Sequence, residues 1–525
     1  MRNYFKYIAI LALGIVSCEP ELDNPIDEAG FYTNGEADFS NYVALGNSLT
    51  AGYADGALYI TGQENSYPNI MAQQFSLVQE TGVFTQPLMA DNAGGLLAGG
   101  TQIPGFNNRR VLAVGTSGPS PQIYTGMAPT TDITNVLSGS FNNMGVPGAK
   151  SFHLLAPGYG NLAGVSVGTA NPYFVRFASS AQTSILADAV AQNPTFFSLF
   201  IGNNDVLSYA TSGGVGEDQT GNPDPSSYGP NDITDPLVFG SVYSQIVTAM
   251  VGTGAGGVLM NIPDVTSIPF FTTVTFNPLT KALLGSGDEA TGTATINALN
   301  TQLYGPLNQA LTAFGAGERI NLLSTTAASN PLLIKDESLT DLSAQLTAAF
   351  TPSLGVATAT FYGNVFGQAR QAKASDLVLL TTSSVIGTAP EGIPAPLDKF
   401  GITYPLQDEH VLIPTEIQAI AVATTAYNVS IEALADSGTN GLAFVDINAF
   451  LTRVANGGIP FDAGTLTSQF VTGGAFSLDG VHPTPRGYAA IANLILDAVN
   501  DKYSSTVPKV NIGNYGTVTL SNEVQ

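Results

Sequence analysis

The first residue that could do chemistry is Ser48, which stands in the motif GNSLT at residues 46–50. The run NYVALG at residues 41–46 is apolar and ends in glycine, so it predicts a strand that enters a turn. Ligands of an open parallel sheet bind at the carboxyl ends of its strands, which is where Ser48 would lie. A serine there becomes a nucleophile if a base removes its proton and donors stabilise the oxyanion. Taken alone, a serine in a strand-to-helix turn is more often a helix cap.

A candidate base stands near the end of the chain, in the motif DGVHP at residues 479–483. Asp479 precedes His482 in a turn that Gly480 and Pro483 would hold, so the carboxylate could orient the imidazole. The second ring nitrogen of His482 would then be free to face a serine. An isolated motif of this composition is more often a surface turn with a solvated histidine.

Two further motifs offer hydrogen-bond donors for an oxyanion. Asn204 lies in GNND at residues 202–205, directly after the apolar run PTFFSLFI, which predicts a buried strand. Gly148 lies in GVPGA at residues 145–149, where a glycine N–H could approach a substrate closely. Asparagine amides and glycine N–H groups are good oxyanion donors, but both motifs are also ordinary turns.

The four motifs, taken together and in this order, resemble the four blocks of the SGNH/GDSL hydrolase superfamily. These blocks carry Ser, Gly, Asn and His along the chain. In this sequence they are GNSLTAGY around Ser48, GVPGA around Gly148, GNND around Asn204 and DGVHPT around His482. The matched residues are a small part of the 525-residue chain, but four blocks in the right order form a specific signal.

The resemblance implies a three-layer α/β/α sandwich with a central, mostly parallel sheet of flavodoxin type. It implies Ser48 as the nucleophile, His482 as general base and then acid, and Asp479 as the orienting carboxylate. The oxyanion hole would consist of the backbone N–H groups of Ser48 and Gly148 and the side chain of Asn204. The implied activity is the hydrolysis of carboxylic esters by an esterase- or lipase-like acylhydrolase.

Two features depart from the family pattern. Asn47 stands where the family usually has aspartate before the nucleophile, which alters the hydrogen bonding around Ser48. The blocks are also further apart than compact members need, so large insertions are expected to shape substrate access. Asn47 therefore supports an alternative: an inactive or weakly active lipoprotein of the same fold that binds a lipid or glycan. The complete Ser/Gly/Asn/Asp/His set argues against this alternative, because a binding protein has no chemical need for it.

The other two histidines are not expected to take part in the reaction. His153, in SFHLL, is predicted to be a packed helix residue rather than a ligand. His410 follows Asp408 and Glu409, a run that suggests a metal site. Two adjacent acids cannot easily face one ion, however, and no distant Cys or His completes a set. The sequence also lacks a phosphate-binding glycine loop, so we expect neither a metal nor a cofactor.

The start of the chain reads as a targeting segment. Residues 1–17 combine a positive start with an apolar run that is too short to span a bilayer comfortably, and Cys18 follows. Residues 15–18, IVSC, look like a bacterial lipobox, whose cysteine becomes the lipid-modified first residue. The alternative is a free thiol in an uncleaved helix. We expect an exported protein that is lipid-anchored at Cys18 in the bacterial cell envelope, at the outer membrane and in some cases surface-exposed.

Composition and charge exclude several kinds of partner. The chain has 16 Lys and Arg against 40 Asp and Glu, a net charge of −24, and no dense basic run. Nucleic-acid binding and electrostatic attachment to anionic lipid are therefore excluded. The expected partner is a small-molecule, lipid or glycan ester, and the lipid at Cys18 is the expected membrane contact. A single cysteine also excludes a disulfide within the chain.

Predicted strands and helices alternate over most of the chain, which favours a parallel sheet with helices on both faces. The final helix is the best defined: Thr484 can cap it, Pro485 can open it, and apolar residues recur at helical spacing. The predicted organisation is a signal peptide at 1–17, an acidic flexible tether at 18–40, a hydrolase-like domain at 41–505 and a tail at 506–525. An inserted, mostly helical region at about 265–415 interrupts the domain. Within it, residues 268–284 are either a lid over an acyl pocket or core of the insertion.

Overall fold

The computed structural model describes residues 31–115, 118–436 and 441–524. The predicted signal peptide, Cys18 and the greater part of the predicted tether lie outside the described residues. Among the helices in the described ranges, none is long and apolar enough to cross a membrane.

A five-stranded sheet forms the centre of the main lobe, and every neighbouring pair of its strands is parallel. This sheet confirms the predicted α/β fold class. The strand order is β13-β8-β7-β1-β6. The strands are β1 (Tyr42–Gly46), β6 (Asn143–Gly145), β7 (Phe196–Phe200), β8 (Gly256–Met260) and β13 (Ala443–Val445). β1 and β7 are buried along their whole length, which explains why both read as continuous apolar runs in the sequence.

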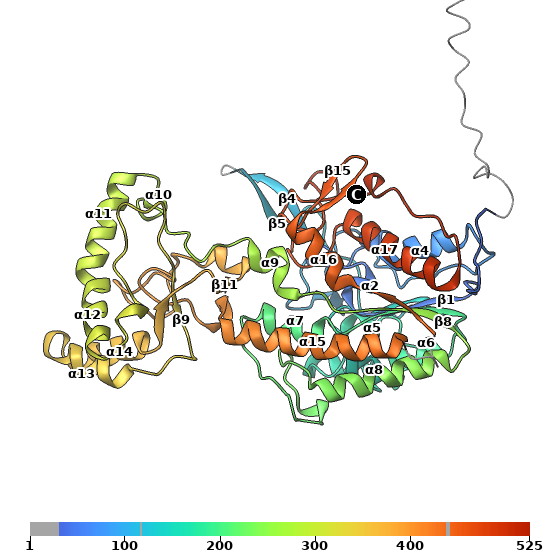
Figure 1. Ribbon diagram of the computed structural model, residues 1–525, viewed down its shortest axis with the longest axis horizontal. Helices are drawn as coiled ribbons and strands as arrows, with labels where there is room; N and C mark the ends of the chain where they lie inside the picture. Colours follow the sequence, from blue (N-terminus) through green and yellow to red (C-terminus); the bar gives the residue numbers. More distant parts are fainter. Residues whose placement is uncertain (1–30, 116–117, 437–440, 525) are drawn as a thin grey trace, which may run out of the picture.

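Long helices contact this sheet from both sides (Figure 1). On one side lie α4 (Tyr67–Phe75) and α17 (Pro485–Tyr503), and on the other lie α8 (Pro236–Val251) and α15 (Pro414–Asp436). The hydroxyl of Thr484 accepts from the N–H of Gly487 and caps α17 as predicted. The apolar stripe of α17 faces the main core, so the carboxyl-terminal helix holds the preceding DGVHP turn against the sheet.

One predicted boundary differs from the structure. The predicted tether ends at residue 40, but Phe39 is fully buried and stacks on Phe75 at a centroid distance of 3.9 Å, so the folded body begins before Asn41. β6 is an edge strand of the central sheet, and its three residues are too few to leave a periodic pattern in the sequence. Outside this sheet, β5 (Gly118–Ile123) forms an antiparallel hairpin with β4 (Arg110–Gly115).

The chain between α9 (Pro269–Thr272) and α15 forms a second lobe with apolar clusters of its own (Figure 1). Its helices are α10 (Lys281–Leu284), α11 (Glu289–Leu299), α12 (Gly305–Ala313), α13 (Ser343–Leu354) and α14 (Val356–Phe366). Its short antiparallel strands are β9 (Leu333–Lys335) with β10 (Ala369–Gln371), and β11 (Leu377–Val378) with β12 (Val411–Leu412).

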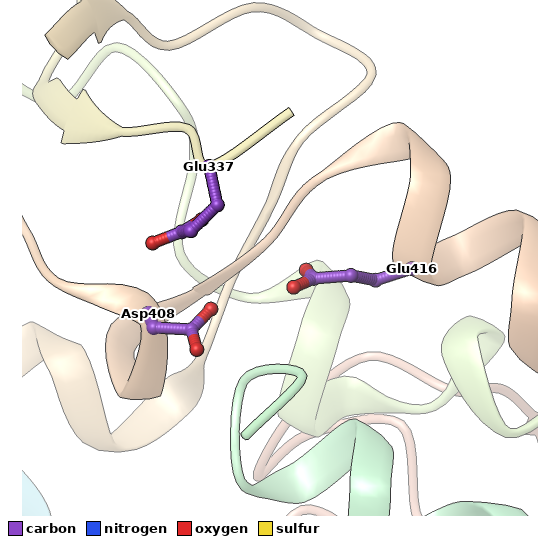
Figure 2. Close-up of side chains that lie close together, drawn as sticks. All are labelled: Glu337, Asp408 and Glu416. Carbon is purple, nitrogen blue, oxygen red and sulfur yellow. The ribbon is translucent and has the colours of Figure 1, made fainter. Parts of the chain in front are cut away.

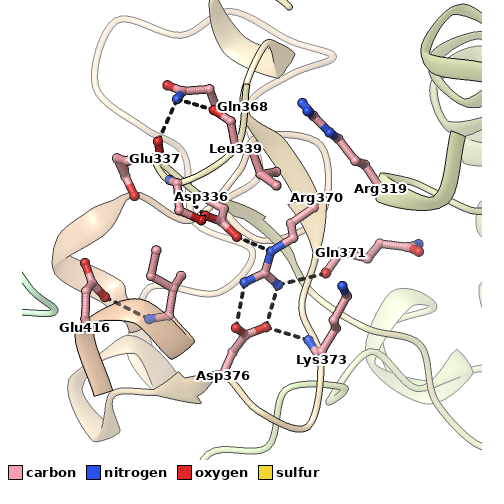
Figure 3. A network of polar contacts seen from close by, with 12 residues as sticks. Arg319, Asp336, Glu337, Leu339, Gln368, Arg370, Gln371, Lys373, Asp376 and Glu416 are labelled. Carbon is pink, nitrogen blue, oxygen red and sulfur yellow. Dashed lines mark hydrogen bonds and ion pairs between the residues drawn. The ribbon is translucent and has the colours of Figure 1, made fainter. Parts of the chain in front are cut away.

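A buried ion-pair network stabilises the strands of this second lobe (Figure 3). Arg370 on β10 donates from Nε to Asp336 at 2.5 Å and from its two Nη atoms to Asp376 at 2.6 and 2.7 Å. The two parallel bonds to Asp376 are the bidentate geometry that only arginine supplies. Each side chain of the network is at most 6% exposed, so removal of Arg370 would leave two uncompensated buried carboxylates.

Candidate active site

The structure brings Ser48, His482 and Asp479 into one hydrogen-bonded chain. Oγ of Ser48 lies 2.9 Å from Nε2 of His482, and Nδ1 of His482 lies 2.8 Å from Oδ2 of Asp479. Ser48 is 6% exposed and the side chain of His482 is 14% exposed, so a small opening leads to the serine. In this geometry the imidazole can take the proton of Ser48 while the carboxylate fixes the orientation of the ring.

Asp479 is held as a carboxylate by a dense set of donors. Oδ1 accepts from the hydroxyl of Ser477 at 3.0 Å and from the N–H groups of Val481 and His482 at 2.9 Å each. Oδ2 accepts from the N–H of Gly56 at 2.9 Å. Burial by itself raises the pKa of Asp479, but the facing imidazole and these donors outweigh burial and hold that pKa well below its usual value.

The turn from β1 into the short helix α2 (Ser48–Ala51) positions the serine. A Cβ on Gly46 would lie 2.1 Å from Oγ1 of Thr50 and 2.4 Å from the carbonyl oxygen of Phe200, so only glycine fits at this sharp turn. Asn47 caps α2, since its Oδ1 accepts from the N–H of Leu49 at 3.0 Å. Its amide nitrogen donates to Oδ1 of Asn203 at 3.2 Å, so Asn47 links the serine block to the asparagine block.

Gly148 and Asn204, two of the predicted oxyanion donors, follow β6 and β7, the strands on either side of β1. Gly148 follows β6 with a φ of +81°, a left-handed conformation that favours glycine. Asn204 begins α7 (Asn204–Thr211) after β7, and its amide donates to the carbonyl oxygen of Ala149 at 2.9 Å. The amide carries a second hydrogen, which leaves a donor for a substrate oxygen. Within the described residues, the N–H groups of Ser48 and Gly148 have no acceptor.

Asp205, which the sequence analysis left without a role, ties the glycine block to the asparagine block. Its carboxylate accepts from the N–H and the hydroxyl of Ser151 at 2.8 and 2.7 Å. Burial raises the pKa of Asp205. GNND ends in this residue, but a carboxylate buried by tertiary contacts has no signal in the sequence, because its partner belongs to another segment.

Asp55 and Arg109, which were not predicted from the sequence, stabilise the turn that contains Asp479. Asp55 accepts from the N–H of Leu478 at 3.0 Å, and the N–H of Asp55 donates to Ser477 at 2.9 Å. Arg109, from the start of the β4 hairpin, pairs with Asp55 at 2.8 Å, and both side chains are at most 4% exposed. The Asp-Gly pair at residues 55–56 was the available signal, since it marks a turn directly after the serine block.

Residues 268–284, expected to be a lid or insertion core, divide between the two lobes. Ile268 lines the cavity beside Ser48, and the N–H of Phe270 donates to the carbonyl oxygen of Gly480 at 2.9 Å, in the DGVHP turn. Leu279, in contrast, is fully buried in an apolar cluster of the second lobe. The segment is therefore the connection between the lobes, and its first part belongs to the candidate active site.

The other two histidines are structural in the described chain. His153 lies in a 3₁₀ helix, stacks on Tyr159 at 4.4 Å and accepts from the N–H of Lys150 at 3.0 Å. Burial lowers the pKa of His153 to about 3, so this ring stays neutral, in line with the packed role predicted for it. His410 accepts from the N–H of Gln407 at 3.1 Å, and burial lowers its pKa too.

Three carboxylates do gather near His410, although not the pair that the sequence suggested. Asp408 lies with Glu337 and Glu416, with ligand atoms all within 4.8 Å of one another, and Glu409 and His410 are not members of the cluster (Figure 2). Burial and the neighbouring charges raise the pKa of Asp408 to about 6 and that of Glu416 to about 8. At neutral pH the carboxyl group of Glu416 is therefore mostly protonated and that of Asp408 mostly charged, so Glu416 can donate its proton to Asp408 in a hydrogen bond.

No family model, curated protein or solved structure matches the chain.

Proposed function

We propose that this chain is a serine hydrolase of the SGNH/GDSL type that cleaves carboxylic esters. The observation that carries the proposal is the hydrogen-bonded chain from Ser48 through His482 to Asp479, beside the donors of Gly148 and Asn204. A serine, an imidazole and a buried carboxylate at these distances form the arrangement that activates a hydroxyl for attack on a carbonyl carbon.

The reaction follows from these positions. Oγ of Ser48 attacks the ester carbonyl while Nε2 of His482 takes its proton, and the carbonyl oxygen becomes an oxyanion. The N–H groups of Ser48 and Gly148 and the amide of Asn204 stabilise that charge. The C–O bond of the ester then breaks, and His482 returns the proton to the leaving alcohol. Water, deprotonated by His482, hydrolyses the acyl-enzyme and releases the acid.

The remaining parts of the proposal concern fold and location. The helices on both sides of the parallel sheet support a three-layer α/β/α sandwich that carries an insertion. The lipobox-like residues 15–18 support export, lipid attachment at Cys18 and a place in the bacterial cell envelope. The partner in this proposal is an ester substrate, and the reaction needs no metal or cofactor.

The alternative is an inactive binding protein of the same fold, and Asn47 was the reason to consider it. Asn47 still caps α2 and contacts Asn203, so the missing aspartate has not disrupted the turn that presents Ser48. In an inactive protein, burial of the Asp479 carboxylate would cost desolvation free energy and serve no reaction. Both points favour the enzyme.

Labelling with a fluorophosphonate tests the proposal directly. The wild type should form a covalent adduct that peptide mass spectrometry locates on Ser48, and Ser48→Ala should form none. Ser241→Ala, at an exposed serine on α8, is the matched control and should label like the wild type. A folded wild type that is not labelled, and that hydrolyses no nitrophenyl ester, would contradict the proposal.

A further inference from the structure

An apolar cavity opens beside Ser48. Its few polar lining residues gather where the reaction takes place: Ser48, His482, Asn204 and the neighbouring Asn47 and Asn203. Every other side chain that lines the cavity is apolar. A polar end at the nucleophile and an otherwise apolar wall is the chemistry of a site for an amphiphilic molecule.

The wall of the cavity is formed by one face of α16 (Ile447–Asn456). Ile447, Phe450, Leu451 and Val454 recur at the spacing of one helical face, and all of them line the cavity. Ile447 lies two residues after the end of β13, at the same end of the sheet as Ser48. From Ile447 to Val454 the helix rises by about 10 Å, so this apolar face of α16 is about that long.

A second, wider cleft is also lined by His482. His482 and Asp479 line it together with Arg110, Ser383 and Ser384, so its wall mixes polar, charged and apolar groups. The two serines belong to the second lobe, which therefore borders the active site. An ester bound at Ser48 has an acyl part and an alcohol part. One space beside Ser48 is apolar and the other is of mixed polarity, so each suits a different part of the ester.

We propose that the apolar cavity holds the acyl chain of the substrate, and that the substrate is an ester of a medium- or long-chain aliphatic acid. The inference rests on the hydrolase function proposed above. The acyl group stays on Ser48 after the ester bond breaks, so its chain occupies the cavity that opens at this residue. The alcohol leaves through the polar cleft beside His482. Short acyl groups such as acetyl would leave the apolar wall of α16 without a partner.

Nitrophenyl esters from acetate to hexadecanoate test the proposal. Each buried methylene should raise kcat/KM by about fourfold, because burial of one CH₂ stabilises the bound state by roughly 0.8 kcal/mol. The rise should continue over several methylenes and stop when the cavity is filled. A kcat/KM that is highest for acetate, or independent of chain length, would overturn the proposal.

Two variants show whether α16 sets the chain length. Val454→Phe narrows the cavity and should reduce kcat/KM for decanoate at least tenfold relative to acetate. Thr452→Phe adds the same ring at an exposed position of the same helix and should leave the chain-length profile unchanged. Leu451→Ala enlarges the cavity and should move the optimum to longer chains, which keeps the proposal testable if Val454→Phe does not fold.

The result separates failure of this inference from failure of the proposed function. Labelling of Ser48 together with a flat chain-length profile would contradict only the proposal that the apolar cavity binds the acyl chain. Absence of both labelling and ester hydrolysis would contradict the hydrolase itself. Unchanged profiles in both Val454→Phe and Leu451→Ala, each folded and active, would place the acyl chain elsewhere.

Discussion

Oγ of Ser48 lies 2.9 Å from Nε2 of His482, although 434 positions separate the two residues in the chain. Ser48 stands at the end of β1, an internal strand of the sheet, and His482 stands in the turn before α17, which packs against the same sheet. The contact therefore depends on how the last helix docks, and the Asp55–Leu478 and Gly56–Asp479 hydrogen bonds fix the register of that docking.

Asp479→Asn should lower kcat by about 10³- to 10⁴-fold. A neutral amide cannot stabilise the imidazolium that forms when His482 accepts the serine proton, and it favours the wrong tautomer of the ring. Ester hydrolysis by the purified variant measures the loss, and circular dichroism checks the fold. Asp497→Asn, at an exposed aspartate of α17, is the control and should keep full activity. An Asp479→Asn enzyme within tenfold of the wild type would remove Asp479 from the mechanism.

Activity should fall as the pH is lowered, and one proton should account for the fall. The lowered pKa of Asp479 keeps its carboxylate charged through the acid range, so Asp479 does not take up a proton there. In the proposed mechanism His482 is the base, and a protonated imidazole cannot act as one. The slope of log kcat/KM against pH should approach one. A flat profile down to about pH 4 would exclude His482 as the base.

Asn204→Ala should reduce kcat by about 10²- to 10³-fold with little change in KM. The amide of Asn204 is proposed to stabilise charge that exists only in the transition state, and one such donor contributes roughly 3 kcal/mol. Asn203→Ala is the neighbouring control: it removes the partner of Asn47 without removing the proposed donor, and its effect should stay below tenfold. Equal losses in both variants would mean that Asn204 acts through structure alone.

Asn47→Asp should leave the enzyme active within about tenfold. The carboxylate keeps the cap on the N–H of Leu49, and a negative charge is favourable at a helix start. The amide of Asn203 can rotate to donate to it, which restores the lost contact. Asn47→Ala loses the cap and should destabilise the fold by about 1 kcal/mol. Measurement of Tm and kcat/KM for both variants separates capping from catalysis, and inactivity of a folded Asn47→Asp enzyme would contradict this interpretation.

The sequence predicted the central sheet and the positions of the reactive groups because those signals are local. β1 and β7 are unbroken apolar runs that end in turn residues, and Thr484 with Pro485 marks the start of α17. Ser48 and Asn204 were each predicted to follow a strand of a parallel sheet, whose carboxyl ends are where ligands bind. The joining of His482 to Ser48 came from the family resemblance, since no local pattern relates the two segments.

The parts that the sequence did not predict depend on contacts between distant segments. The ion pair of Asp55 with Arg109 and the hydrogen bond from Ser151 to Asp205 each join different parts of the chain, so no local motif predicts either contact. The cavity beside α16 is likewise a result of packing, because an apolar helix face reads as ordinary core. β6 was missed for a different reason, since three residues do not establish a period.

Glu416→Gln should make the stability of the protein less dependent on pH. The raised pKa values of Asp408, about 6, and of Glu416, about 8, mean that the folded state holds protons that the unfolded state releases. Their contribution to stability is therefore complete below about pH 4 and is lost as the pH rises through 6 to 8. Glutamine resembles protonated glutamic acid and can still donate to Asp408.

Thermal unfolding between pH 5 and 9 tests this prediction, in EDTA so that no divalent cation neutralises the cluster. The fall in Tm should be smaller for Glu416→Gln than for the wild type. Glu432→Gln, at an exposed glutamate of the same helix, removes an equal charge and should follow the wild type. If Glu416→Gln loses Tm between pH 5 and 9 as steeply as Glu432→Gln does, the proton shared by Asp408 and Glu416 does not stabilise the folded protein.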